Sequence, residues 1–88
     1  MKIKKDFILR EVAGSWIVVP IGTALVNFNG MITLNETGAF LWRALEIGAD
    51  EHALVKALTS EYNVSLSTAE TDIGLFIKKM KEIGCLEE

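Results

Sequence analysis

The sequence has little of the side-chain chemistry on which enzymes and metal proteins depend. Its 88 residues include one cysteine, one histidine and one proline. A single cysteine excludes an internal disulfide and a cysteine-rich metal site. No apolar run approaches the roughly 18 residues of a membrane-spanning helix, and the N-terminus does not resemble a signal peptide. We therefore expect a cytoplasmic protein without a membrane partner.

Positive charge is scarce as well. The chain has twelve acidic and nine basic residues, which gives a formal net charge of −3 and a pI near 5.1. Between Glu36 and Leu75 seven acids stand against two bases, and the remaining bases gather towards the two ends of the sequence. A protein that binds nucleic acid mainly through phosphate needs the opposite balance. We expect no nucleic-acid partner.

Apolar residues are plentiful, because half of the chain is hydrophobic. This share argues against disorder. A chain of this length folds as one domain, residues 1–88, and buries about 60 to 65% of the surface that its unfolded form exposes. The core is therefore small.

The first third of the chain has the residue types of β-strands. Phe7–Val12 and Trp16–Val19 read as a hairpin with a turn at Gly14-Ser15, and Pro20 ends or bends the second strand or lies on a sheet edge.

Residues 24–28 resume extended character. An Asn-Gly pair at 29–30 then suits a tight turn that would fold Met31–Leu34 back along residues 26–28 as a further strand, the alternative being a looser loop over 27–30.

Asn35 marks the change from extended to helical periodicity. Its side chain can accept hydrogen bonds from the first turn of a helix, which we predict over Glu36–Ile47 with an end at Gly48. Gly38 allows close approach on this helix. Its apolar stripe is Leu41, Trp42 and Leu45.

Two more helices follow. Asp50 is the predicted N-cap of the second, which ends before Asn63. Ser67 and Glu70 have the spacing of a capping box, so we predict that the third helix starts after Ser67 and ends at Gly84. Its apolar positions follow helical spacing over four turns. They are Ala69, Ile73, Phe76, Ile77, Met80 and Ile83. The fold class is thus α+β: an N-terminal three-stranded antiparallel sheet followed by a three-helix bundle.

Catalysis by this chain is not expected. His52 falls in the polar first turn of the second helix and suits a surface position, and Cys85 lies in an apolar setting typical of a packed thiol. The glycines are dispersed and form no phosphate-binding loop. We predict no catalytic residues, no metal and no cofactor.

Two features favour binding instead. In a meander the strand Met31–Leu34 pairs on one side only, which leaves a free row of backbone N–H and C=O groups. Leu75 lies nearly opposite the core stripe of the third helix, where Asp72 and Lys79 flank it. If this flank lies beside the free edge, the two form a groove for an added strand.

The residues resemble the PqqD-like family, the coenzyme PQQ synthesis protein D group with its related recognition elements of ribosomal peptide modification. The resemblance covers nearly the whole chain, and its most specific part is Leu-Asn-Glu-Thr at 34–37. The other segments that carry it are Leu9–Gly14, Val19-Pro20, Ile32–Gly38, Phe40–Trp42 and Lys81–Leu86.

The resemblance implies a winged-helix-like, non-catalytic domain that binds the leader segment of a ribosomally made precursor peptide. The leader adds to the third strand, rests on the third helix, and is presented to a modifying enzyme, often a radical S-adenosylmethionine enzyme. The implied peptide-binding residues are Met31, Ile32, Thr33, Leu34, Asp72, Leu75, Phe76 and Lys79.

Alternatives remain at this point. The opposite flank of the third helix carries Gly74, Lys78 and Lys81, and periodicity does not choose between the flanks. The stretch from Ile21 to residue 29, longer than in shorter family members, either shields or extends the strand edge. The runner-up functions are a DNA-binding winged helix, which the exposed acids Glu70 and Asp72 disfavour, and a module that dimerises through its free strand edge.

Overall fold

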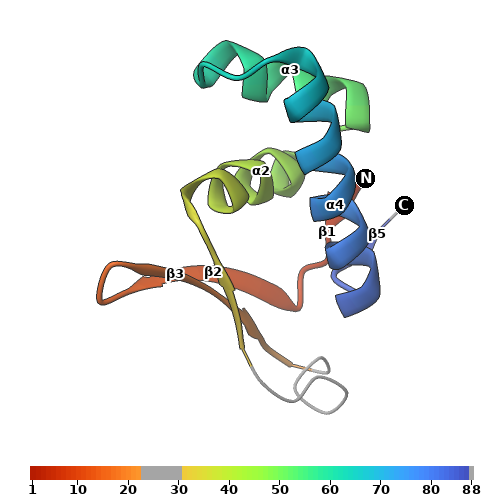
Figure 1. Cartoon of the computed structure of the whole chain (residues 1–88). Helices are drawn as coiled ribbons and strands as arrows, with labels where there is room; N and C mark the ends of the chain where they lie inside the picture. Colours follow the sequence, from red (N-terminus) through yellow and green to blue (C-terminus); the bar gives the residue numbers. More distant parts are fainter. Residues whose placement is uncertain (23–30, 88) are drawn as a thin grey trace.

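A computed structural model gives the fold and describes residues 1–22 and 31–87 (Figure 1). The predicted extended segment at 24–28, the Asn-Gly turn at 29–30 and most of the longer stretch from Ile21 to residue 29 lie outside the described residues. The described elements confirm the predicted class, a three-stranded antiparallel sheet followed by three helices. In chain order they are β1 (Lys2–Ile3), β2 (Phe7–Val12), β3 (Ser15–Pro20), β4 (Ile32–Leu34), α2 (Glu36–Ile47), α3 (Glu51–Glu61), α4 (Leu66–Ile83) and β5 (Leu86–Glu87).

The strands β2, β3 and β4 form the three-stranded sheet in that order. Val12 pairs with Ser15, so the hairpin turn is Ala13-Gly14, one residue earlier than predicted. Both turn residues have positive φ, 52° at Ala13 and 81° at Gly14. A two-residue turn with both φ values positive matches the right-handed twist of the two strands. Because this turn favours glycine as its second central residue, it forms at Ala13-Gly14 and not at Gly14-Ser15. The hairpin projects away from the helices (Figure 1).

The helix α2 follows β4 directly, with Asn35 as the only residue between them. Asn35 Oδ1 accepts a hydrogen bond of 2.7 Å from the Gly38 N–H, as its predicted capping role requires. The helix ends at Gly48, whose φ of 114° few other residues adopt. The bounds Glu36–Ile47 are those that the sequence predicts.

The helix α4 begins earlier than predicted. Ser65, not Ser67, is its N-cap, and Ser65 Oγ accepts a hydrogen bond from the Thr68 N–H at 3.2 Å. The predicted capping box of Ser67 and Glu70 is therefore wrong, because Ser67 lies inside the helix. Both serines are suitable N-cap residues. Capping at Ser65 allows a longer helix than capping at Ser67, and this is the cap that the structure contains. The helix ends at Gly84 in the left-handed conformation, as predicted.

A second, smaller sheet joins the two ends of the chain and was not predicted. Lys2 pairs with Glu87 and Ile3 with Leu86 in antiparallel register. The Lys4 N–H also donates to the Cys85 carbonyl at 2.9 Å. The strands β1 and β5 therefore lie side by side, next to α4 (Figure 1).

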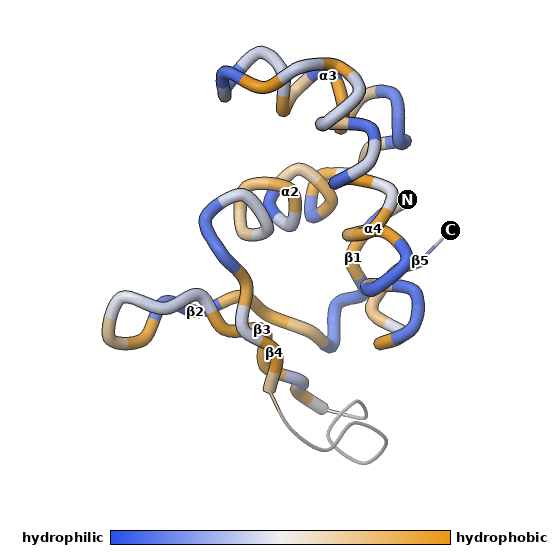
Figure 2. The backbone as a smooth tube through the Cα atoms, in the orientation of Figure 1, coloured by the Kyte–Doolittle hydropathy of each residue, from blue (hydrophilic) through white to orange (hydrophobic). Residues whose placement is uncertain are grey.

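The core lies between the sheet and the helices. Each helix mixes hydrophobic and hydrophilic residues along its length (Figure 2), so that one face of each can pack inward. The indole of Trp42 is fully buried, and two ring contacts attach other parts of α2 to its neighbours. The Arg43 guanidinium lies 4.4 Å from the centre of the Trp16 ring on β3, and Phe40 meets Tyr62 edge to face. The largest fully buried side chains are those of Trp42, Leu41, Leu45, Leu54, Leu58, Ile73, Met80, Val18 and Cys85.

Candidate functional site

Within the part of the chain that the structure describes, the strand β4 lies at the edge of its sheet, because it pairs with β3 and with no other strand. Its register places Trp16 opposite Leu34 and Ile17 opposite Thr33. In an antiparallel pair, alternate residues point their N–H and C=O groups away from the partner strand. Among residues 1–22 and 31–87, the outer side of β4 therefore has no backbone partner, and its N–H and C=O groups can pair with another chain.

A groove of about 420 Å³ lies between this strand and α4. Six of the eight predicted site residues line it together. They are Thr33, Leu34, Asp72, Leu75, Phe76 and Lys79. Met31 is 68% exposed and precedes β4, Ile32 is half-buried, and neither lines this groove.

The groove is also lined by four residues that were not predicted as site residues. They are Asn35, Thr37, Gly38 and Leu41. All four belong to the first half of α2 or its cap, and Leu41 is a neighbour of both Thr37 and Gly38 on the helix surface because it follows them by four and three positions. The signal was present in the helical spacing, but only the packing of α2 beside β4 turns that face towards α4.

The apolar part of the groove combines buried and open surface. Leu34 and Leu41 are buried and form part of its wall, whereas Phe76 is half-buried and Leu75 is 63% exposed. Leu75 therefore has apolar surface that a bound segment can cover. Covering a leucine fully is worth about 1.5 to 3 kcal/mol, so the exposed part of this one is worth about 1 to 2 kcal/mol.

Gly38 sets how closely α2 approaches β4. A Cβ at this position would come within 3.2 Å of Leu34 Cβ and 3.3 Å of Asn35 Oδ1. Both distances are shorter than ordinary van der Waals contacts, so the absence of a side chain allows the approach that the sequence predicts. The wall of the groove depends on this contact.

The opposite flank of α4 lies elsewhere. Gly74, Lys78 and Lys81 line a separate cavity of about 560 Å³, together with Glu51, Ile77 and Glu82. The structure thus places the flank of Asp72, Leu75, Phe76 and Lys79 beside β4. Helical periodicity alone left this choice open.

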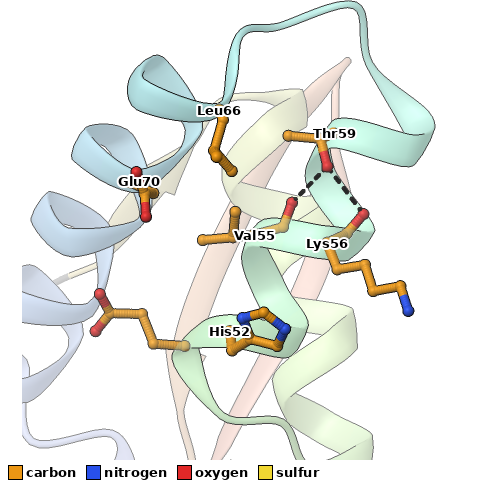
Figure 3. A pocket seen from close by; sticks show the side chains of 7 residues that line it. His52, Val55, Lys56, Thr59, Leu66 and Glu70 are labelled. Carbon is orange, nitrogen blue, oxygen red and sulfur yellow. Dashed lines mark hydrogen bonds between the residues drawn. The ribbon is translucent and has the colours of Figure 1, made fainter.

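A larger cavity of about 610 Å³ lies between α3 and the first turns of α4 (Figure 3). His52 is exposed there, as predicted, and Val55 and Leu66 supply apolar surface. The Thr59 hydroxyl is already committed to its own helix, because it donates to the carbonyls of Val55 and Lys56. This cavity has helices on both sides and no strand edge, so it offers no backbone pairing to a peptide.

A fourth cavity, of about 650 Å³, lies near the strands at the two chain ends. Its lining is Lys4, Lys5, Asp6, Ile21, Gly22 and Glu87.

The described residues contain neither a metal-binding cluster nor a cysteine with a lowered thiol pKa. No three His, Cys, Asp or Glu side chains of residues 1–22 and 31–87 lie close enough together to hold a metal ion. Cys85 is fully buried, and burial raises the pKa of its thiol to about 11. A thiol in this state is a poor nucleophile at neutral pH. In the same residues, no helix is long and apolar enough to cross a membrane.

Comparison with solved structures finds the same fold in two peptide-bound proteins. TbiB1, solved in complex with the TbiA(beta) leader peptide, is 24% identical to this chain and superposes with a TM-score of 0.78 over 99% of this chain and 95% of its own. Lasso peptide synthetase B1, complexed with the leader peptide, is 23% identical with a TM-score of 0.76, over 99% and 96%. A comparison with curated proteins found no match.

Comparison with protein families matches most of the chain. The family described as coenzyme PQQ synthesis protein D (PqqD) matches residues 16–86, a span that runs from the second residue of β3 to the first residue of β5. It includes β4, the whole of α4 and every residue of the groove. The chain therefore belongs to the PqqD family.

Proposed function

We propose that this chain binds the leader segment of a ribosomally synthesised precursor peptide and presents it to a modifying enzyme, such as a radical S-adenosylmethionine enzyme. The leader adds as a strand along the free edge of β4 and lays its side chains against α4. Membership of the PqqD family supports this function, as do the two proteins of the same fold that are solved with leader peptides. The chain acts as a binding partner and carries out no chemical step.

The observation that carries the proposal is the groove itself. An open backbone edge and an apolar helix flank line the same cavity, which is the arrangement that strand addition needs. Backbone bonds give affinity to any extended segment, whereas the helix side chains select among segments. Neither feature alone would distinguish a peptide site from an ordinary sheet edge.

The energetics require both features. Four or five backbone hydrogen bonds contribute about 0.5 to 1.5 kcal/mol net each. Association costs about 4 kcal/mol or more in lost freedom of motion. Backbone pairing alone therefore leaves little net affinity, so stable binding also needs the apolar contacts with Leu75 and Phe76.

The DNA-binding alternative finds no support on α4. Its first half presents Glu70, Thr71 and Asp72, all exposed. A recognition helix uses such positions for basic or amide side chains that contact base edges and phosphates. Acidic side chains there would repel the DNA backbone.

Leu75→Asp tests the proposed function. Leu75 is 63% exposed, so the substitution removes apolar contact from the groove with little effect on folding. We expect at least a tenfold loss of affinity for a leader peptide encoded beside this protein, measured by isothermal titration calorimetry. NMR shifts of the labelled wild-type protein should concentrate at β4 and at the flank of Leu75, and a DNA duplex should cause none.

Leu66→Asp is the matched control. Leu66 lies on the same helix and is 62% exposed, but it lines the cavity between α3 and α4. This variant should bind the peptide as the wild type does. Equal loss in both variants, or peptide shifts centred on α3, would contradict the proposed site. Self-association of the free protein through β4, without binding of any leader peptide, would favour the dimerisation module instead.

A further inference from the structure

We propose that the groove selects its peptide by the order of charges along it. The favoured segment reads, from its N-terminus to its C-terminus, basic, any residue, apolar, any residue, acidic. Asp72 contacts the basic residue and Lys79 the acidic one, with the apolar residue between them. This inference rests on the proposed function, since it names the class of peptide that the same groove takes.

The four groove residues of α4 form one ordered row. Asp72, Leu75, Phe76 and Lys79 stand at positions i, i+3, i+4 and i+7, which fall on one face of a helix. The row therefore reads acidic, apolar, apolar, basic along the helix axis. At a rise of 1.5 Å per residue, the two charged residues lie about 10.5 Å apart along the axis.

Both charges are available to a ligand. Among the described residues, neither Asp72 nor Lys79 makes a hydrogen bond or an ion pair with another side chain, and both are exposed. A strand that enters the groove displaces water from around them. A peptide residue of opposite charge then replaces lost hydration, whereas a residue of like charge adds repulsion.

The spacing of an extended strand fits this row. Alternate side chains of a strand point to the same side and lie about 6.8 Å apart, so three successive inward side chains span about 13.6 Å. The outer two reach slightly beyond the two charged helix positions, and the flexible stem of lysine covers the difference. The middle one falls over the apolar pair Leu75 and Phe76.

The direction of the peptide follows from the directions of β4 and α4. In Figure 1, β4 runs up towards α2, whereas α4 runs down from α3 towards β5. A peptide added antiparallel to β4, the pairing that β4 already makes with β3, runs the same way as α4. Its N-terminal residue then lies by Asp72, nearer the start of α4, and its C-terminal residue by Lys79.

Three synthetic peptides test the charge order. They share one apolar core and carry the central sequence Lys-Thr-Leu-Thr-Glu, the reversed charges Glu-Thr-Leu-Thr-Lys, or glutamine at both ends. We expect the first to bind the wild type about tenfold more tightly than the second at low salt, with the glutamine peptide between them. Fluorescence anisotropy measures each affinity. The difference should shrink in about 0.5 M salt, because salt screens exposed charges.

Exchanging the two protein charges sharpens the test. In the double variant Asp72→Lys, Lys79→Asp the preference should invert, so that the reversed peptide binds more tightly. The control exchanges two charges on the same helix outside the groove, Glu70→Lys with Lys78→Asp, and keeps the net charge the same. It should retain the wild-type preference.

The outcomes separate the two proposals. Equal binding of all three peptides would overturn the charge order and leave peptide binding in place. A preference of the wild type for the reversed peptide would overturn the direction assigned here. If none of the three bound at millimolar concentration, and leader peptides also left β4 unaffected, peptide binding itself would be overturned.

Discussion

At the scale of single residues, Cys85 shows how position determines chemistry. The thiol is fully buried, and its Sγ lies 3.5 Å from both the Met80 carbonyl oxygen and the Met80 sulfur. Burial disfavours the thiolate, and this raises the pKa from 9.0 to about 11. The backbone of the same residue is also engaged, since its N–H donates to the Met80 carbonyl and its own carbonyl accepts from Lys4. The sequence prediction of a packed thiol is confirmed.

This shift predicts a loss of stability in alkali. Below pH 9.0 the thiol is protonated in both the folded and the unfolded chain, and its full contribution to stability is present. Between pH 9.0 and pH 11 the unfolded chain loses the proton while the folded chain retains it, so the free energy of unfolding falls. Urea unfolding across this range should show a steeper decline for the wild type than for Cys85→Ala.

The control for that measurement is the comparison at neutral pH. There Cys85→Ala should be less stable than the wild type by about 1 kcal/mol, because it leaves a small cavity in the core. The two stability curves should converge above pH 9.0 and cross before pH 11, because the titration costs the wild type more stability than the cavity costs the variant. Curves that stay parallel would show that the thiol does not titrate differently on unfolding.

At the scale of elements, each helix begins with a side-chain cap, but only one cap belongs to the groove. Asn35 and Asp50 each accept a 2.7 Å hydrogen bond from the backbone N–H three residues on. We expect Asn35→Ala and Asp50→Ala to lower the free energy of unfolding by similar amounts, about 1 kcal/mol each. Thermal or urea unfolding measures this directly.

The two cap variants should differ in peptide binding. Asn35 joins β4 to α2 and lines the groove, so its loss should weaken binding of a leader peptide severalfold. Asp50 caps α3 and does not line the groove, so Asp50→Ala should bind as the wild type does. Equal weakening in the two variants would mean that the effect reflects lost stability and not the geometry of the site.

The elements also show which signals the sequence carries. The bounds of α2 are predictable because a strong cap, an apolar stripe and a terminal glycine agree on them. The start of α4 is ambiguous because Ser65 and Ser67 both suit a cap, and local sequence does not rank them. The strands β1 and β5 have two residues each, too few for any periodicity, and their pairing depends on the whole fold.

The candidate site was predictable in part for a related reason. Helical spacing identifies which residues share a face, and it placed Asp72, Leu75 and Lys79 together. Spacing does not say which element lies beside that face, so the choice between the two flanks of α4 and the contribution of α2 both required the fold. The roles of these residues in peptide binding remain predictions.

At the scale of the whole molecule, the small sheet of β1 and β5 has a kinetic consequence. It joins residues 2–3 to residues 86–87, so it is a contact between residues separated by nearly the whole sequence. The entropy lost on closing so long a loop is recovered only when the rest of the fold already holds the ends near each other. We expect this pairing to form after the transition state for folding.

Ile3→Val tests this order of events. Ile3 is 6% exposed in β1, and removal of one methylene should cost about 0.5 to 1.5 kcal/mol. If the pairing forms late, stopped-flow kinetics should show faster unfolding and an almost unchanged folding rate. A slower folding rate would instead mean that β1 and β5 already pair in the transition state for folding. The last contact to form is also the first to open, so amide protons of β1 and β5 should exchange with solvent before those of α4.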